Sequence, residues 1–240
     1  MNGAIPNGLM PPSLHRHPKP HKELWRRYRR YAAVQEFRIS VLLSIVTFFA
    51  SLIVVSYAIQ YATESASNSV TDIILSNTPV FDVDGLFVYG TALFAVFATA
   101  LLFAHPKRVP FALHGIALFY FIRSAFISLT HLGPFPVHEV SSFDFGAVLS
   151  RLFFGGDLFF SGHTGIAFLL ALMFWREKTV RNIFLVWSAF FATIVLLGHY
   201  HYSIDVASAF FISYGIFHIA EWLFPKDRAM FLDDEPSLRV

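Results

Sequence analysis

The chain has 240 residues, of which 55% are hydrophobic and 18% aromatic, while only 14% are charged. This balance excludes an ordinary soluble domain, and a net charge of only +2 gives no whole-chain basis for binding nucleic acid. The chain has no cysteine, which excludes disulfides, thiolate metal sites and a cysteine nucleophile.

The N-terminal part reads as two segments. Residues 1–21 are rich in proline, glycine, histidine and asparagine without an apolar period, which is typical of a disordered tail. Residues 22–38 form a basic segment in which arginines alternate with Trp25, Tyr28 and Tyr31. Such a segment can bind nucleic acid, but beside an apolar stretch it favours an interfacial helix on anionic lipid. The layout of a cleaved signal peptide is missing, so we expect the first span to act as its own insertion signal.

Six apolar stretches follow, each long enough, or nearly so, for the ~20 residues that a bilayer span needs. They cover residues 39–63, 85–105, 111–132, 162–175, 180–198 and 204–224. The fourth is short alone and reaches full length only if its helix begins near the Ser-Gly turn or runs to Lys178. The sequence therefore predicts an all-α polytopic membrane protein, with a six-span domain over residues 39–224 and a tail over residues 225–240.

The basic residues between the spans predict the orientation, because cytoplasmic loops carry an excess of lysine and arginine. They cluster before the first span and after the second, fourth and sixth: Lys107, Arg108, Arg176, Lys178, Arg181, Lys226 and Arg228. The alternate connections, 64–84, 133–161 and 199–203, contain a single basic residue, Arg151. We therefore expect both termini to be cytoplasmic and the alternate connections to lie on the non-cytoplasmic face.

Three groups near that face look chemically matched. His201 and Asp205 are spaced i, i+4, so their side chains can meet if Asp205 opens a helix. A carboxylate that holds one imidazole nitrogen leaves the other as a nucleophile or base. His163 follows a Ser-Gly turn where a helix starts, and helix N-termini attract phosphate. The set suggests phosphoryl transfer through a phosphohistidine, whereas the plainer alternative is three helix-end polar groups at the water boundary.

Two neighbouring features leave alternatives open. Arg123 lies inside a span, where an unpaired charge is expensive, so we expect either a phosphate partner or an ion pair with an acid of the external side. His199 has His-x-His spacing with His201, and with Asp205 the two histidines have donor types that can hold zinc. A helix junction aims the two imidazoles poorly for one metal, so we predict no metal site.

The motifs resemble those of a known family. D-L-F-F-S-G-H-T (157–164) and H-Y-H-Y-S-I-D-V (199–206) are similar to the paired signatures of sphingomyelin synthases and their relatives in the lipid phosphate phosphatase superfamily. R-S-A-F-I-S-L-T-H-L-G-P-F-P (123–136) resembles the family's Arg-led segment, with Gly133 as an extra residue, and N-T-P-V-F-D (77–82) resembles its Pro-x-x-Asp motif.

The resemblance implies a metal-free and cofactor-free six-span enzyme whose active site lies on the exoplasmic face. It implies that His201 attacks the phosphorus of a glycerophospholipid head-group ester, that Asp205 orients it, and that His163 protonates the departing diacylglycerol oxygen. His163 then deprotonates the acceptor hydroxyl, so ceramide gives a phosphosphingolipid and water gives a phosphate monoester or free phosphate. Because one histidine must be neutral and the other charged, we expect an activity optimum between their pKa values.

The chain departs from the phosphatases of the superfamily. It lacks their Lys-x6-Arg-Pro segment and the Ser-Arg pair six residues ahead of the nucleophile, where Ile194 and Val195 stand instead. Without these cations a monoester dianion binds poorly, whereas a phosphodiester carries one negative charge, which favours a head-group transferase.

We expect the substrate to contact Asp157, Arg123, His199, Tyr202 and Asp82. Asp157 either tunes His163, contacts a head-group amine or caps the following turn, and Tyr200 and Tyr202 either cage a choline or anchor at the interface. Glu139 and Asp144 are candidates for an extra acid. No small-xxx-small face stands out, so no oligomeric state is predicted. The competing functions are a lipid phosphatase or phospholipase-C-like hydrolase on the same triad, and a transporter or non-catalytic lipid binder.

Overall fold

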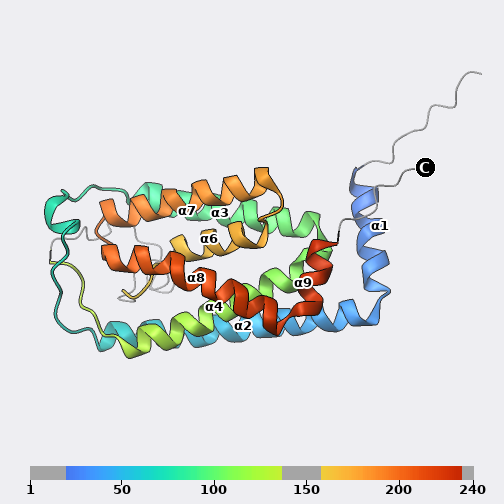
Figure 1. Ribbon diagram of the computed structural model, residues 1–240, viewed down its shortest axis with the longest axis horizontal. Coiled ribbons are helices and arrows are strands. Elements are labelled where there is room, and N and C mark those ends of the chain that lie inside the picture. The colour runs from blue at the N-terminus through green and yellow to red at the C-terminus, as the bar shows by residue number, and fades with distance from the viewer. Residues whose placement is uncertain (1–19, 137–157, 234–240) are drawn as a thin grey trace, which may run out of the picture.

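The computed structural model describes residues 20–136 and 158–233, and every regular element in these two stretches is helical. In chain order the elements are α1 (Pro20–Ala32), α2 (Gln35–Glu64), the 3₁₀ turn η1 (Leu75–Asn77), α3 (Asp84–Ala104), the 3₁₀ turn η2 (Pro106–Arg108), α4 (Val109–Leu129), α6 (Gly162–Met173), α7 (Lys178–Leu197), α8 (Ser203–Leu223) and α9 (Pro225–Leu232). The long helices run along one axis, and α1 lies crosswise at the end of the bundle where α9 also lies (Figure 1). The all-α prediction is confirmed.

Five helical stretches are long and apolar enough to cross a membrane: α2, α3, the run Pro106–Leu129 that includes α4, α7 and α8. Large apolar side chains on their outer faces are exposed, among them Leu42, Phe49, Val96 and Phe211. Such faces would be unfavourable in water but suit the hydrocarbon of a bilayer. The chain is therefore an integral membrane protein, while six spans and cytoplasmic termini stay predictions.

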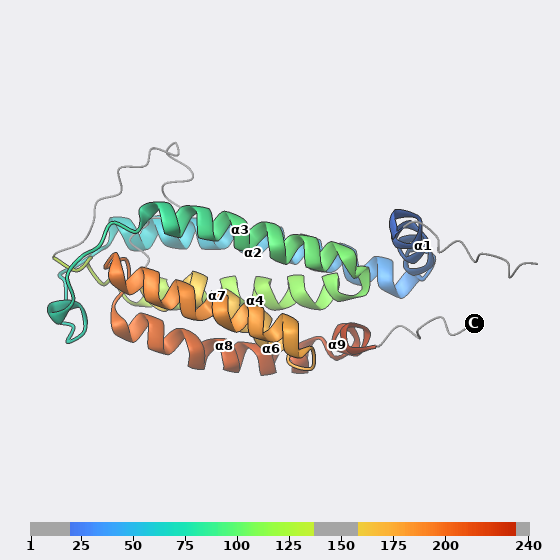
Figure 2. The same cartoon turned by 90° about the horizontal axis from the view of Figure 1, so that it is seen from above.

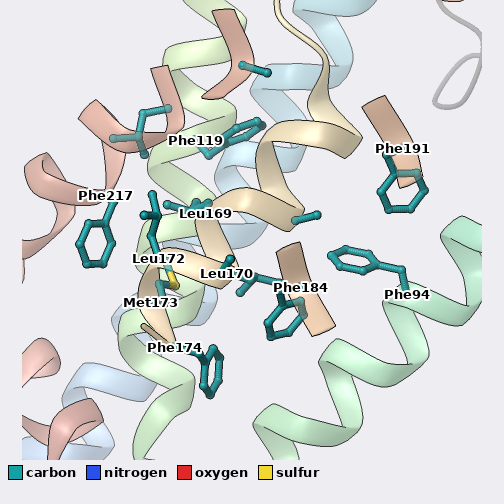
Figure 3. Packing of buried hydrophobic residues seen from close by; sticks show 14 of the residues in the cluster. Phe94, Phe119, Leu169, Leu170, Leu172, Met173, Phe174, Phe184, Phe191 and Phe217 are labelled. Carbon is teal, nitrogen blue, oxygen red and sulfur yellow. The ribbon is translucent and has the colours of Figure 1, made fainter. Parts of the chain in front are cut away.

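The fourth predicted span, 162–175, forms only the 12-residue helix α6. Its length is about 18 Å, short of the ~30 Å hydrocarbon core. It contacts α4, α7 and α8, and lies between α7 and α8 in Figure 1, whereas α7 covers most of it when the bundle is seen from above (Figure 2). The core that surrounds it is drawn in Figure 3, where Leu169, Leu170, Leu172 and Met173 of α6 lie among Phe94, Phe119, Phe184, Phe191 and Phe217. Protein rather than lipid thus covers α6, so its short length leaves no polar backbone in hydrocarbon.

The predicted segment boundaries shift at both ends of the chain. Residues 1–19 lie outside the described part, so the structure does not test the prediction that they form a disordered tail. The basic segment 22–38 divides between α1 and the start of α2, with the break at Ala33 and Val34. The tail 225–240 begins with α9, whose first residue is Pro225 and whose Phe231 is buried against the bundle. Proline at the first helical position is favourable because its missing N–H would have no partner there.

Gly165 sets the distance between α6 and α8. A Cβ at this position would lie 2.7 Å from the Phe119 ring and 2.9 Å from Ser213 Oγ, which donates to the Gly165 carbonyl at 3.1 Å. We expect Gly165→Ala to lower the unfolding free energy by about 1–3 kcal/mol, because the extra methyl overpacks the core. Thermal unfolding in detergent measures the change.

Gly215 of α8 provides the matched control, since a Cβ there meets nothing within 4 Å. Gly215→Ala should be neutral or stabilise by up to ~1 kcal/mol, the helix-propensity difference. Equal effects of the two substitutions would contradict the role of Gly165.

Candidate active site

The turn between α7 and α8 carries a histidine–carboxylate contact. His201 Nδ1 lies 3.5 Å from Asp205 Oδ2, Asp205 is fully buried, and the His201 side chain is 11% exposed. Asp205 is the third residue of α8, and its Oδ2 also accepts the Tyr202 backbone N–H at 3.0 Å. This capping bond fixes the carboxylate toward His201, so Nε2 is the imidazole nitrogen left for chemistry.

His163 is the second residue of α6, at the same end of the bundle. Its ring packs edge-on against Phe87 of α3, with 4.6 Å between centroids, and lies 5.4 Å from the ring of Phe191 of α7. The two residues before it connect it to the other groups: Ser161 N–H donates to the Asp205 carbonyl, and a Cβ at Gly162 would lie 3.2 Å from Arg123 Nε. The start of α6, the start of α8 and the intramembrane arginine therefore meet at one site.

Arg123 reaches this site from the last part of α4. Its side chain is buried, Nε donates to the Phe160 carbonyl at 3.2 Å, and the guanidinium carbon lies 5.9 Å from the centroid of the Phe160 ring. A Cβ at Gly162 would stand 3.2 Å from Arg123 Nε. A larger residue here would push the guanidinium away by a few tenths of an ångström, so glycine favours its close approach to the start of α6, directly before His163.

The two motifs are joined through their backbones. Ser161 N–H donates to the Asp205 carbonyl at 3.1 Å, and Ser161 Oγ donates to Thr164 Oγ1 at 3.1 Å. Among the described non-glycine residues, positive φ occurs at Phe160 (φ 32°) and His199 (φ 55°), one within each motif. Such strained residues persist only where their surroundings hold them. Both strained positions flank the histidine–carboxylate site.

Comparison with known families agrees with this geometry. Residues 155–222 match the family model described as "PAP2 superfamily C-terminal", a segment that includes His163, His201 and Asp205. This matched stretch, called here the PAP2 segment, is similar to the C-terminal part of that superfamily. No curated protein matches the chain, and no solved structure does either. The similarity covers the stretch that carries both histidine motifs, and the activity of the whole chain is a matter of proposal.

The PAP2 segment carries apolar residues where a phosphatase of this superfamily would be expected to hold cations. Ile194 and Val195 are buried near the end of α7. The Val195 carbonyl accepts the N–H groups of Tyr200 at 2.9 Å and His201 at 3.4 Å. Val195 therefore shapes the turn that presents His201 and adds no charge to it.

Some predicted substrate-binding residues of the PAP2 segment bond to the protein itself. Tyr202 is 1% exposed; its hydroxyl donates to the Gly133 carbonyl at 2.8 Å and accepts the Val70 N–H at 3.2 Å. Burial, with the charges of Asp205 and Asp72, raises the pKa of Tyr202, so the phenol stays protonated and able to donate. Tyr202 therefore connects the loops that contain Gly133 and Val70, and its buried ring has no face open to a choline.

The other residues predicted to contact the substrate are buried, exposed, or outside the described part of the chain. His199 is buried, with its ring 5.4 Å from that of Phe135. Within the described residues no three His, Asp or Glu side chains form a metal-binding group, so the zinc alternative for His199, His201 and Asp205 finds no geometric support. Asp82 is exposed and accepts the Asp84 N–H at 3.3 Å, at the start of α3. The predictions for Asp157, Glu139 and Asp144 lie outside the described residues.

Asp84 and Tyr200 form a further contact behind the PAP2 histidines. Tyr200 donates its hydroxyl to the buried carboxylate of Asp84, the first residue of α3. The Phe87 ring lies 5.4 Å from that of Tyr200 and, on its other side, contacts His163. This hydrogen bond connects α3 to the turn that carries His201, and no sequence motif predicted it.

Asp72 is a buried acid that the sequence did not single out. Its Oδ1 accepts the N–H groups of Ile74 at 2.8 Å and Leu75 at 3.1 Å, and its Oδ2 accepts the N–H of Ser203 at 2.7 Å. Burial acts to raise the pKa of Asp72, but the bonds from Leu75, Ser203 and Ile74 outweigh it and lower the pKa below its usual value. One carboxylate thus connects the segment between α2 and α3 to the start of α8.

We expect Asp72→Asn to lower the unfolding free energy at neutral pH by about 1–3 kcal/mol, because an amide nitrogen would face the Ser203 N–H. A lowered folded-state pKa gives stability that is present above the unfolded pKa and lost as pH falls through the folded pKa, which places the loss below about pH 4. Wild type and Asp72→Asn should therefore converge in acid unfolding curves. Asp82→Asn is the control, and a loss as large as that of Asp72→Asn would contradict the prediction.

Proposed function

We propose that the chain moves a phospho-head group from a glycerophospholipid to a lipid alcohol such as ceramide, through a phosphohistidine on His201. The observation that carries the proposal is the gathering of His163, Arg123 and the His201–Asp205 pair at one end of the bundle. The site lies at the end opposite α1 and α9 (Figure 1), and the basic residues near those helices support placing it on the non-cytoplasmic face.

In the first half-reaction, His201 Nε2 attacks the donor phosphorus. A nitrogen–phosphorus bond forms as the bond to the diacylglycerol oxygen breaks, and His163 gives that oxygen its proton. Asp205 holds Nδ1–H and stabilises the charge that His201 acquires, and the 3.5 Å contact should shorten in the complex. Arg123 faces the same space and can balance the charge on the phosphoryl oxygens.

In the second half-reaction, His163 takes a proton from the acceptor hydroxyl. The hydroxyl oxygen then attacks phosphorus, the nitrogen–phosphorus bond breaks, and His201 returns to its starting state. A lipid alcohol gives a new phosphodiester, whereas water gives the phosphorylated head group. The same three residues thus serve either acceptor, and access to the site selects between them.

The buried apolar residues Ile194 and Val195 favour a phosphodiester over a phosphomonoester. A monoester dianion needs more positive charge around it than a diester with one negative charge, because both must leave water. Neither of these two positions carries a basic side chain, so the site suits the single negative charge of a diester. This difference in charge supports a transferase.

The proposal is tested with purified protein in mixed micelles. Labelled phosphatidylcholine or phosphatidylethanolamine is supplied with and without ceramide, to wild type and to His201→Ala. We expect a new ceramide-dependent phospholipid that the variant does not make, and the active donor identifies the head group.

Two other outcomes separate the alternatives. A water-soluble phosphorylated head group released without ceramide would replace the transferase with a phospholipase-C-like hydrolase on the same residues, and free phosphate from phosphatidic acid would indicate a phosphatase. Lipid binding without chemistry in wild type would leave a binder or transporter and overturn the proposal.

A further inference from the structure

The end of the bundle formed by α1, η2 and α9, called here the α9 end, has its own set of charged groups. Its described acids that are not fully exposed are already paired, in three contacts. Glu177 Oε1 lies 2.6 Å from Arg108 Nη2, Glu221 Oε1 lies 2.9 Å from Arg228 Nε, and Asp227 Oδ2 lies 2.8 Å from His114 Nδ1. Asp227 also accepts the hydroxyl of Ser40, and Glu221 the Nδ1 of His218 at 3.1 Å. No half-buried acid of this end is left over.

Lys107 remains as a cation without a partner. It is the middle residue of η2, it is 4% exposed, and its Nζ is buried with no hydrogen-bond partner in the part of the chain that the structure describes. A buried ammonium is costly unless an anion and hydrogen-bond acceptors compensate it. Nζ therefore carries three donors for which residues 20–136 and 158–233 supply no acceptor.

The surroundings of Lys107 indicate the ligand. η2 contacts α1 and α9, and α1 is held there by the hydroxyl of Tyr28, which donates to the Phe103 carbonyl at 2.8 Å near the end of α3. α1 lies crosswise to the bundle, as a helix in the membrane interface would, and carries the exposed arginines Arg26, Arg29 and Arg30 (Figure 1). A membrane-surface anion would meet Lys107 here, between the interfacial helix and the first turn of α4.

We propose that Lys107 binds a phosphate group at the α9 end, supplied by an anionic phospholipid of the leaflet that α1 contacts. When the lipid binds, Nζ turns from its buried position toward the head group, the phosphate oxygens accept from it and compensate its charge, and the bound head group joins η2 to α1. This site is at the opposite end of the bundle from His201, so it stands whether or not the proposed head-group transfer is correct.

Thermal unfolding in micelles of a neutral detergent tests the proposal, with phosphatidylglycerol or phosphatidylcholine titrated in. For wild type we expect a saturable rise in Tm with phosphatidylglycerol and none with phosphatidylcholine, since a ligand that binds only the folded state stabilises it. Lys107→Met keeps an apolar stem and removes the charge. It should weaken the apparent affinity for phosphatidylglycerol at least about tenfold, the effect of losing one charge-assisted bond.

Lys226→Met is the matched control, because Lys226 lies at the same end and is exposed. It should keep the full Tm rise. The proposal is overturned if Lys107→Met keeps the rise or if Lys226→Met loses as much. Inorganic phosphate, compared with sodium chloride at equal ionic strength, identifies the source: a saturable rise with phosphate alone assigns a soluble phosphate, and a rise only with the lipid assigns the head group.

A second measurement does not depend on folding of the variant. In native mass spectrometry of wild type, phosphatidylglycerol should stay bound at a collision energy that removes detergent and phosphatidylcholine. Equal retention of the two lipids would contradict a site that selects an anionic head group.

Discussion

We expect His201→Ala to lower the rate of head-group transfer at least about a thousandfold, because it removes the only atom that can form the covalent intermediate. His163→Ala should cost about 10²–10⁴-fold with natural lipids, the usual contribution of a general acid–base. The two losses are distinguishable, since the residues act on different bonds. Labelled donor should leave acid-labile phosphorus on wild type and none on His201→Ala.

An activated donor separates the two roles further. p-Nitrophenyl phosphocholine has a leaving group that departs as an anion and needs no proton. With this donor, His163→Ala should release an initial burst of p-nitrophenolate as wild type does, whereas His201→Ala should release none. Thermal unfolding of both variants checks that neither loss of activity comes from loss of the fold.

The opposite pattern would exchange the roles of the two histidines. A burst in His201→Ala but not in His163→Ala would make His163 the nucleophile, and equal rescue of both would exclude a covalent intermediate on either.

The helix limits could be predicted because a helix that crosses lipid must consist mainly of apolar residues. Hydropathy gave 85–105 and 180–198, and the helices run Asp84–Ala104 and Lys178–Leu197. The same property does not show what surrounds α6. Hydrocarbon tails are as apolar as leucine, so a helix buried among other helices has the composition of one exposed to lipid. The 12 residues of α6 are fewer than a usual span has, and α4, α7 and α8 cover them.

The candidate site could be predicted in so far as its contacts are local. His201 and Asp205 are one helical turn apart, so their spacing indicated the contact. Asp72 reaches Ser203 across 131 residues, and no local pattern carries that bond. The positive φ at Phe160 and His199 also left no signal, because glycine or asparagine usually occupies such positions. Long-range bonds and strained backbone depend on the assembled fold.

Asp205→Asn should lower kcat by about 10²–10⁴-fold while changing the unfolding free energy little. The Asn oxygen can still accept the Tyr202 N–H, which Asp205 Oδ2 accepts at 3.0 Å, so the start of α8 keeps its cap. The lost charge no longer supports the cation on His201, and an amide NH2 facing Nδ1 selects the wrong tautomer of the imidazole. Transfer kinetics and thermal unfolding of the same preparation measure both quantities.

Asp72→Asn makes the same chemical change at the next backbone N–H of α8, that of Ser203. The hydrogen bonds that the Asp72 carboxylate accepts come from Ser203, Ile74 and Leu75, so the change does not touch the contact with His201. The two variants should therefore show crossed effects: Asp205→Asn loses activity and keeps stability, whereas Asp72→Asn loses stability and keeps most of its kcat at a temperature where it is folded. Asp205→Ala, which lacks the cap as well, should lose both. If Asp205→Asn unfolded as readily as Asp72→Asn, or kept wild-type kcat, Asp205 would be a helix cap and not the partner of a nucleophile.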